Sequence, residues 1–161
     1  MAKFLIIAEE QERKIAEEIF PDIPVIVAGV GAFNIMKSLR DLPLDSELYN
    51  VGYAGSANYP IGSIVAVNSV RLNHPNVNYP EPEYAISVVP AGKPYDFEAV
   101  CYTGVDFCLH SDYKDCVFDM ELAFIAGLGF KKVHSVKLVS DNLSLHEYRE
   151  VGAGVEEATK N

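Results

Sequence analysis

Hydrophobic positions along the chain fall either in short continuous runs or at helical spacing. Residues 3–8, KFLIIA, have the continuous pattern of a buried strand. Residues 11–20 place Ile15, Ile19 and Phe20 on one face of a helix. The same reasoning predicts further strands at 25–31, 47–55, 61–70, 98–104 and 131–141, and further helices at 32–39 and 120–130.

One long segment departs from this alternation. Residues 71–96 contain five prolines, which exclude a continuous helix and leave at most a short strand around 84–89, so we expect a surface excursion there. We expect the tail 151–161 to fray. Elsewhere strands and helices follow one another without repeats or linkers. The pattern predicts a single α/β domain over residues 1–161, with three layers in which helices cover both faces of a central mixed, largely parallel sheet.

Composition and charge narrow the class of partner. With 161 residues and 49% hydrophobic positions, the chain can bury the core of one domain without disulfides or a structural metal. A net charge of −10 argues against nucleic acid, which requires clustered Lys and Arg. No apolar run approaches the roughly 18 residues of a membrane span. We therefore expect no nucleic-acid or membrane partner and a cytoplasmic location.

The cysteines and histidines do not have the spacing of a metal site. The three cysteines lack any C-x-x-C pair, which favours reduced thiols over a disulfide framework or a zinc site. The four histidines are scattered without an i, i+4 pair. We therefore expect neither a metal nor another cofactor.

Two carboxylates lie at positions that are unusual for their surroundings. Glu121 falls at the start of the apolar, helix-like stretch VFDMELAFIA, and Asp141 ends the strand-like run VKLVSD. A carboxylate in an apolar run costs stability unless something uses it, and open α/β sheets bind ligands where strands end. The pattern predicts that both face one small-molecule pocket. Helix capping by Asp141 and a first-turn position for Glu121 and Asp119 are the structural alternatives.

Several segments, taken in order, resemble a known superfamily. The segments are VAGVGAFN, YNVGYAGS followed by IGSIVAV, YTGVDF, FDMELAFIA and VKLVSDN. They are similar to the successive signature segments of the nucleoside phosphorylases and nucleosidases, particularly the methylthioadenosine/S-adenosylhomocysteine (MTA/SAH) nucleosidases and the futalosine hydrolases. The resemblance implies a phosphorylase/hydrolase-like fold, a nucleosidase that hydrolyses the N-glycosidic bond of a purine-type nucleoside, and a homodimer or higher homo-oligomer.

The resemblance also implies roles for individual residues. Asp141 would give a proton to the leaving purine at N7, and Ser140 would support it. Glu121 would bind the ribose hydroxyls, and Met120 would pack against the sugar. Phe107 would stack on the base.

The nucleophile end of the pocket is less well defined by the resemblance. A glutamate in the loop after the first strand would activate the attacking water, and AEEQE offers Glu9, Glu10 and Glu12. Glu10 is the favoured choice. Gly55 and Tyr53 belong to the glycine-rich end of the third strand, and Tyr53 stands where the family usually has a small Ser or Thr.

Departures from the family pattern leave two alternatives open. Asn50 stands where a phosphorylase may carry arginine, and Lys137 stands where we expect arginine. A phosphate-dependent phosphorylase would therefore need an arginine from elsewhere, such as Arg71 or a neighbouring subunit. The chain is also shorter than a typical nucleosidase between IGSIVAV and YTGVDF, so a non-catalytic nucleoside-binding or interaction protein of the same fold is the other alternative.

Overall fold

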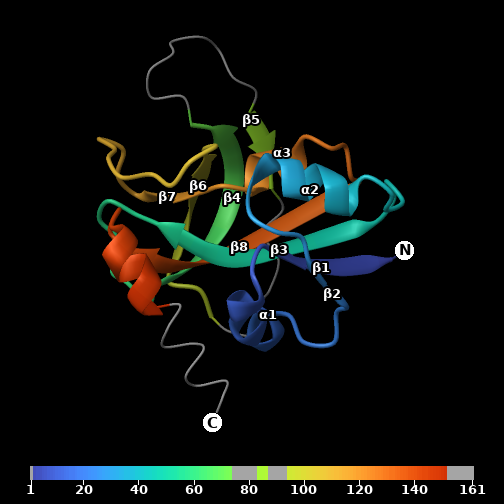
Figure 1. Ribbon diagram of the computed structural model, residues 1–161, viewed down its shortest axis with the longest axis horizontal. Helices are drawn as coiled ribbons and strands as arrows, with labels where there is room; N and C mark the ends of the chain where they lie inside the picture. Colours follow the sequence, from blue (N-terminus) through green and yellow to red (C-terminus); the bar gives the residue numbers. More distant parts are fainter. Residues whose placement is uncertain (1, 74–82, 87–93, 152–161) are drawn as a thin grey trace.

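A computed structural model describes residues 2–73, 83–86 and 94–151 (Figure 1). In this part of the chain eight strands form one mixed sheet with the order β2-β1-β3-β7-β6-β4-β5, and β8 pairs with both β3 and β4. The strands are β1 Lys3–Ile7, β2 Val25–Val27, β3 Glu47–Gly55, β4 Ile64–Leu72, β5 Glu83–Ala85, β6 Phe97–Thr103, β7 Cys116–Asp119 and β8 Lys132–Asp141. The helices are a 3₁₀ turn at Glu10–Glu12, α1 Arg13–Ile19, α2 Gly31–Leu39 and α3 Leu122–Ala126, and residues 145–151 are also helical.

Five of the strands close on themselves. β3 pairs with β8, β8 with β4, β4 with β6, β6 with β7, and β7 returns to β3 through the antiparallel pair Gly55 and Phe118. The pairs β3–β8, β4–β6 and β6–β7 are parallel, as are the pairs that add β1 and β2. The sheet is therefore largely parallel, as predicted, but it curls into a ring where the sequence indicated an open sheet.

Helices lie on both sides of the sheet (Figure 1). On one side, α1 packs through Ile19 against Leu5 and Ile7 of β1. On the other side, α2 and α3 pack against Ile6 of β1 through Ile35 and Ile125. Successive strand residues point to opposite faces, so adjacent side chains of β1 enter two separate cores. The three-layer α/β arrangement predicted from the sequence is confirmed.

The segment 116–126 differs from its prediction. The sequence predicted a helix at 120–130, within an apolar stretch that looked helix-like from 117, but Cys116–Asp119 forms the short strand β7 and α3 spans only Leu122–Ala126. All four residues of β7 are buried, so hydrophobic positions on both faces of a strand imitate an apolar helix. Met120 and Glu121 form the junction between β7 and α3 and so follow a strand end.

Two other predictions concern segments at the limits of the described chain. The short strand expected within 84–89 corresponds to β5, Glu83–Ala85. Residue 86 is not part of the strand, and residues 87–89, much of the excursion 71–96 and most of the tail lie outside the described residues. Within the described part, no helix is long and apolar enough to cross a membrane.

Candidate active site

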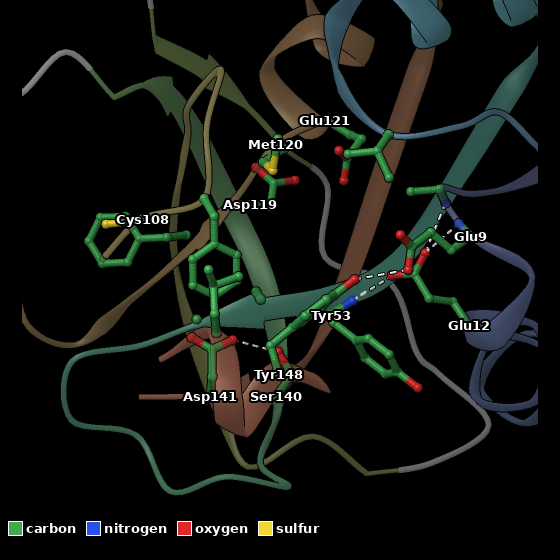
Figure 2. A pocket seen from close by; sticks show the side chains of 17 residues that line it. Glu9, Glu12, Tyr53, Cys108, Asp119, Met120, Glu121, Ser140, Asp141 and Tyr148 are labelled. Carbon is green, nitrogen blue, oxygen red and sulfur yellow. Dashed lines mark hydrogen bonds between the residues drawn. The ribbon is translucent and has the colours of Figure 1, made fainter. Parts of the chain in front are cut away.

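A cavity of about 250 Å³ lies where the strands end (Figure 2). Its walls come from the residues that follow β1, β2, β6 and β7 and from the last residues of β3 and β8. Every site residue predicted from the sequence lines it, except Glu10: the lining includes Tyr53, Gly55, Phe107, Met120, Glu121, Ser140 and Asp141. The predicted convergence of Glu121 and Asp141 on one pocket is therefore what the structure shows.

Asp141 is held at the end of β8 by short-range hydrogen bonds. The Ser140 hydroxyl donates to Asp141 Oδ1 at 2.7 Å, and the Leu143 N–H donates to Oδ2 at 2.9 Å. Burial raises the pKa of Asp141, although both donors favour its charged form. A carboxyl group that keeps its proton to a higher pH than usual is suited to act as a general acid.

Gly55 is required by the position of this carboxyl group. β3 and β8 run in parallel, with Gly55 opposite Asp141 after a shift in register. A Cβ atom on residue 55 would lie 2.8 Å from Asp141 Oδ2. Only glycine therefore lets the end of β3 approach the acid this closely.

Glu121 precedes the first residue of α3 and reaches across to the start of α2. Its Oε2 accepts a hydrogen bond of 3.0 Å from the Gly31 N–H. Burial, together with the neighbouring charge of Asp119, raises the pKa of Glu121 to about 8. Glu121 is the N-cap residue of α3, but its side chain makes no capping hydrogen bond within that helix.

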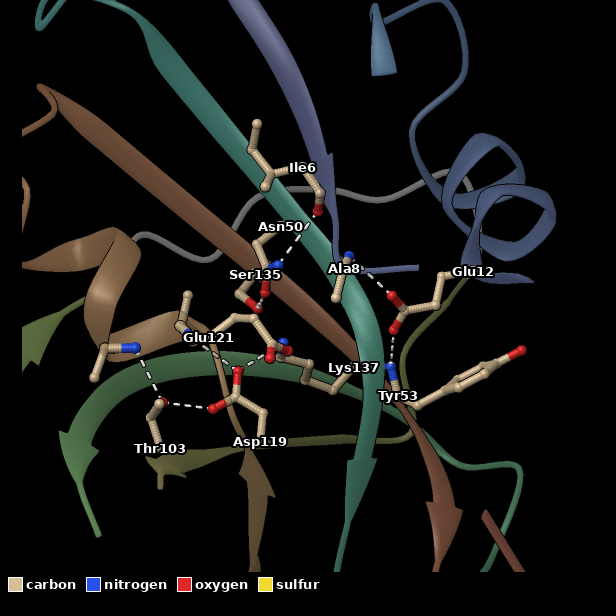
Figure 3. Close-up of polar contacts among 12 residues, drawn as sticks. Ile6, Ala8, Glu12, Asn50, Tyr53, Thr103, Asp119, Glu121, Ser135 and Lys137 are labelled. Atoms are coloured by element: carbon tan, nitrogen blue, oxygen red, sulfur yellow. Dashed lines mark hydrogen bonds and ion pairs between the residues drawn. The ribbon is translucent and has the colours of Figure 1, made fainter. Parts of the chain in front are cut away.

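A buried ion pair supports this side of the pocket (Figure 3). Lys137 Nζ lies 2.9 Å from Asp119 Oδ2, and both side chains are almost fully buried. Asp119 also accepts the Thr103 hydroxyl and, at 2.8 Å, the Leu122 N–H. Burial opposes the charge of Asp119, but Lys137 and Thr103 outweigh it and hold its pKa below its usual value. The first-turn position considered for Asp119 is wrong, because Asp119 is the last residue of β7 and α3 begins at Leu122. Its contact with α3 is the hydrogen bond from the Leu122 N–H, and the ion pair is additional to it.

The structure separates the three glutamates of the first loop. Glu10 is exposed, is hydrogen-bonded to Arg13 and lies outside the pocket, so the preference for Glu10 is corrected. Glu12 lines the pocket and is buried. Its Oε1 accepts the N–H groups of Ala8 and Glu9, each at 2.9 Å, and its Oε2 accepts the Tyr53 N–H at 2.7 Å. Burial raises the pKa of Glu12 against these donors.

A glycine also makes room for Glu12. A Cβ atom on residue 52 would lie 2.7 Å from Glu12 Oε2 and 3.6 Å from Lys137 Nζ. The buried carboxylate therefore sits directly against the backbone of β3. Tyr53, which follows, lines the cavity without filling it, and its hydroxyl lies 3.4 Å from the Gln11 carbonyl oxygen. Burial, followed by the charges of Glu12 and Glu9, raises the pKa of Tyr53 to about 12.

Sequence reasoning missed several residues of the pocket wall, among them Tyr148, whose side chain has a polar contact to a carboxylate of the lining. Tyr148, on the helical segment 145–151, lines the cavity and donates a hydrogen bond of 2.9 Å from its hydroxyl to Glu9 Oε2. Its ring also contacts Phe107 and Tyr53 edge-on, at centroid distances of 5.6 and 6.1 Å. The spacing of Leu145 and Tyr148, which places both on one helical face, is the signal that the sequence offered.

The Asp, Glu, Lys and Arg residues that line the cavity are all acidic ones. Among the described residues the cavity is lined by Glu9, Glu12, Asp119, Glu121 and Asp141, and by no Lys or Arg. Arg71, the arginine proposed for a phosphorylase, lies on β4 and is paired with Glu83. No group of three or more His, Cys, Asp or Glu in the described chain could hold a metal ion.

Comparison with solved structures identifies the fold. An MTA/SAH nucleosidase from Chlamydia trachomatis superposes with a TM-score of 0.75 at 18% identity, covering 98% of this chain and 93% of that one. The MTA/SAH nucleosidase of Streptococcus pneumoniae, in complex with 8-aminoadenine, gives 0.71 at 16% identity, covering 99% of this chain and 96% of that one. The enzyme of Neisseria meningitidis, in complex with methylthio-immucillin-A, superposes with a TM-score of 0.71 at 15% identity, covering 99% of this chain and 95% of that one.

The chain has the fold of the MTA/SAH nucleosidases. The fold-level part of the resemblance noted in the sequence is therefore confirmed. No protein-family model matches the sequence, and the search of curated proteins finds no match. The nucleosidase fold is thus evident from the three-dimensional structure at a sequence identity of 15–19%.

Proposed function

We propose that the chain is a nucleosidase that hydrolyses the N-glycosidic bond of a purine-type nucleoside. The observation that carries the proposal is the convergence of Glu12, Glu121 and Asp141 on one cavity of about 250 Å³. Cleavage of this bond builds positive charge on the sugar and negative charge on the base. An acid at the base and carboxylates near the sugar both stabilise that transition state. The fold shared with the MTA/SAH nucleosidases supports the same reaction class.

The base is bound at the Asp141 end in this proposal. Phe107 stacks on the purine, and Asp141 transfers its proton to N7 as the bond between the base and C1′ breaks. Ser140, whose hydroxyl donates to Asp141 Oδ1, then stabilises the carboxylate that forms. The raised pKa of Asp141 keeps the proton available for this step.

The sugar and the attacking water occupy the opposite side. Glu121 accepts hydrogen bonds from the ribose hydroxyls, and Met120 packs against the sugar. Glu12 takes the proton of a water molecule as the water oxygen forms its bond to C1′. Three backbone N–H groups hold the Glu12 carboxylate in place, so the base is positioned before substrate binds.

Water is a better nucleophile than phosphate for this pocket. A phosphate co-substrate needs arginine or backbone donors, and the described lining has five acidic residues and no Lys or Arg. Lys137 Nζ is already engaged by Asp119 at 2.9 Å. A phosphate would therefore find no free cation in the described lining, which favours hydrolysis over phosphorolysis.

Base release from a panel of nucleosides, measured with and without phosphate, tests the proposal. Release that is independent of phosphate supports a hydrolase, and release that requires phosphate supports the phosphorylase alternative. We expect Asp141→Asn to reduce release by at least about 100-fold, the usual effect of losing a general acid. Nucleoside binding without release would instead favour the non-catalytic alternative. Unchanged release by the Asp141→Asn variant would contradict the role of Asp141.

The proposal includes a homo-oligomer in the cytoplasm. Phe33 and Met36 lie on α2 with 71% and 51% of their surfaces exposed, next to exposed Val30 of the pocket lining. Large apolar side chains clustered on a surface are typical of an interface. The three cysteines are free thiols, which fits a reducing compartment. Light scattering of the purified chain tests the assembly.

A further inference from the structure

One wall of the cavity carries a carboxylate, that of Glu9, which has no role in the proposed reaction. Glu9 follows β1 and lines the pocket, and its Oε2 accepts the Tyr148 hydroxyl at 2.9 Å. Gln11 Nε2 is hydrogen-bonded to the same oxygen and lies 3.4 Å from the Tyr148 hydroxyl. Glu9 and Tyr148 form this wall, and Gln11, which is not part of the lining, supports it as a second hydrogen-bond donor to Glu9.

The position of Glu9 relative to Asp141 indicates which part of a bound nucleoside lies next to Glu9. Figure 2 shows Glu9 and Asp141 on opposite sides of the pocket, with Tyr148 extending toward Glu9 between them. In the proposed binding mode the base lies at Asp141 and the ribose hydroxyls lie at Glu121. The 5′ carbon is at the end of a nucleoside away from the base, so it points toward Glu9.

We propose that Glu9 selects purine-type nucleosides that carry a hydrogen-bond donor, a hydroxyl or an amino group, on the 5′ carbon, over those with an apolar 5′ substituent such as an alkylthio group. The inference rests on the proposed function. It assigns to Glu9 the specificity of the reaction and to Tyr148 the positioning of Glu9.

The Tyr148 contact shows that the Glu9 carboxylate accepts a hydrogen bond from a hydroxyl at this place in the pocket. A carboxylate offers about four lone-pair sites, so two donors on Oε2 leave capacity for a further donor from the substrate. A 5′-hydroxyl can use that capacity, or it can replace the tyrosine hydroxyl. In either case the carboxylate stays hydrogen-bonded when substrate displaces water.

An apolar 5′ group has the opposite effect. It would remove water from Glu9 and provide no donor in return, which leaves a carboxylate poorly solvated. A site built to hydrogen-bond a substrate hydroxyl rejects the analogue without it for this reason. The discrimination therefore comes mainly from the penalty on the wrong substrate.

Adenosine and 5′-deoxyadenosine form a matched pair that differs only in the 5′-hydroxyl. We expect kcat/KM for base release to be about 10- to 100-fold higher for adenosine, the range typical of a hydrogen bond to a charged group. Inosine and 5′-deoxyinosine should give a similar ratio, because the base does not contact Glu9. Comparison of the two ratios separates selection at the 5′ end from selection of the base.

The variant Glu9→Met should reduce the adenosine preference by about tenfold or more and improve cleavage of 5′-methylthioadenosine. Glu10→Met is the control, because Glu10 is adjacent in sequence, exposed and outside the lining. Tyr148→Phe, which removes the positioning contact but keeps the carboxylate, should reduce the preference for adenosine less than Glu9→Met does. Thermal unfolding of each variant checks that the fold is kept.

The outcomes distinguish this inference from the proposed function. If base is released and 5′-deoxyadenosine is used as well as adenosine, or if Glu9→Met leaves the ratio unchanged, the inference is wrong and the nucleosidase proposal stands. If no base is released, calorimetric binding of the same pair decides. Tighter binding of adenosine supports the inference while the catalytic proposal fails, and equal binding or no binding overturns the inference as well.

Discussion

Glu10 and Glu12 are two residues apart, yet their surroundings are opposite. Glu10 is exposed and its pKa is lowered by the hydrogen bond to Arg13. Glu12 is buried against β3, where three backbone N–H groups bind it and burial raises its pKa. A general base must be positioned before it can act, and of these two glutamates only Glu12 is held by hydrogen bonds within the pocket.

At the residue scale we therefore expect Glu12→Gln to lower the rate of base release by at least about 100-fold. Glutamine keeps the shape and can accept from the same N–H groups through one oxygen, but it cannot take a proton from water. Glu10→Gln is the matched control and should leave the rate unchanged. Steady-state kinetics of both variants measure the difference, and equal losses would show that neither glutamate is the base.

At the scale of elements, β8 supplies both Asp141 and the buried cation of the site. Gly52 of β3 lies opposite Lys137, and Gly55 lies opposite Asp141. Lys137 then joins β8 to β7 through Asp119, and Asp119 joins β7 to α3 through the Leu122 N–H. The ion pair therefore sets how the strand end at 141 sits relative to the junction that holds Glu121.

Removing one partner of a buried pair leaves an uncompensated charge. We expect Lys137→Met to lower the free energy of unfolding by about 3–5 kcal/mol. The double variant Lys137→Met, Asp119→Asn should recover much of this loss, because asparagine can still accept the Leu122 N–H without a charge. Denaturant titration measures both. A double variant no more stable than Lys137→Met would contradict this account of the pair.

At the scale of the whole molecule, the acidic pocket makes stability depend on pH. Burial raises the pKa of Glu121 from its ordinary value of 4.5 to about 8, so between these values the folded chain keeps a proton that the unfolded chain has lost. Stability from this group is fully present below pH 4.5 and is lost as pH rises through about 8. Glu12 and Asp141, whose pKa values are also raised, act in the same direction.

We expect the free energy of unfolding to fall with rising pH across this range, by up to about 1.4 kcal/mol per pH unit from Glu121. Glu121→Gln should flatten the dependence, because glutamine does not titrate. Glu10→Gln, an exposed control, should not change the slope within this range. Denaturant unfolding at a series of pH values measures this slope. An unchanged slope in Glu121→Gln would show that Glu121 is not the group responsible.

Much of the fold could be predicted because its signals are local. The hydrophobic run of β1, the helical spacing of α2 and the full length of β3 are each contained in one segment of sequence. Strand β7 could not be recognised, because its four buried residues are followed at once by the apolar residues of α3, and a continuous apolar run does not separate a short strand from a helix. The ring closure depends on pairings such as β4 with β8, between segments far apart in the chain.

The candidate site also has features that local sequence predicts and features that only tertiary contacts decide. The sequence by itself determined that Glu121 and Asp141 are acids at element ends, because strand ends and helix starts leave local patterns. Only the tertiary structure decided between Glu10 and Glu12, since the N–H that binds Glu12 Oε2 belongs to Tyr53. The tertiary structure likewise brings the Tyr148 hydroxyl into hydrogen-bond contact with Glu9 and pairs Lys137 with Asp119. The protonation and partners of a carboxylate depend on what surrounds it in space, and folding supplies those neighbours from distant parts of the chain.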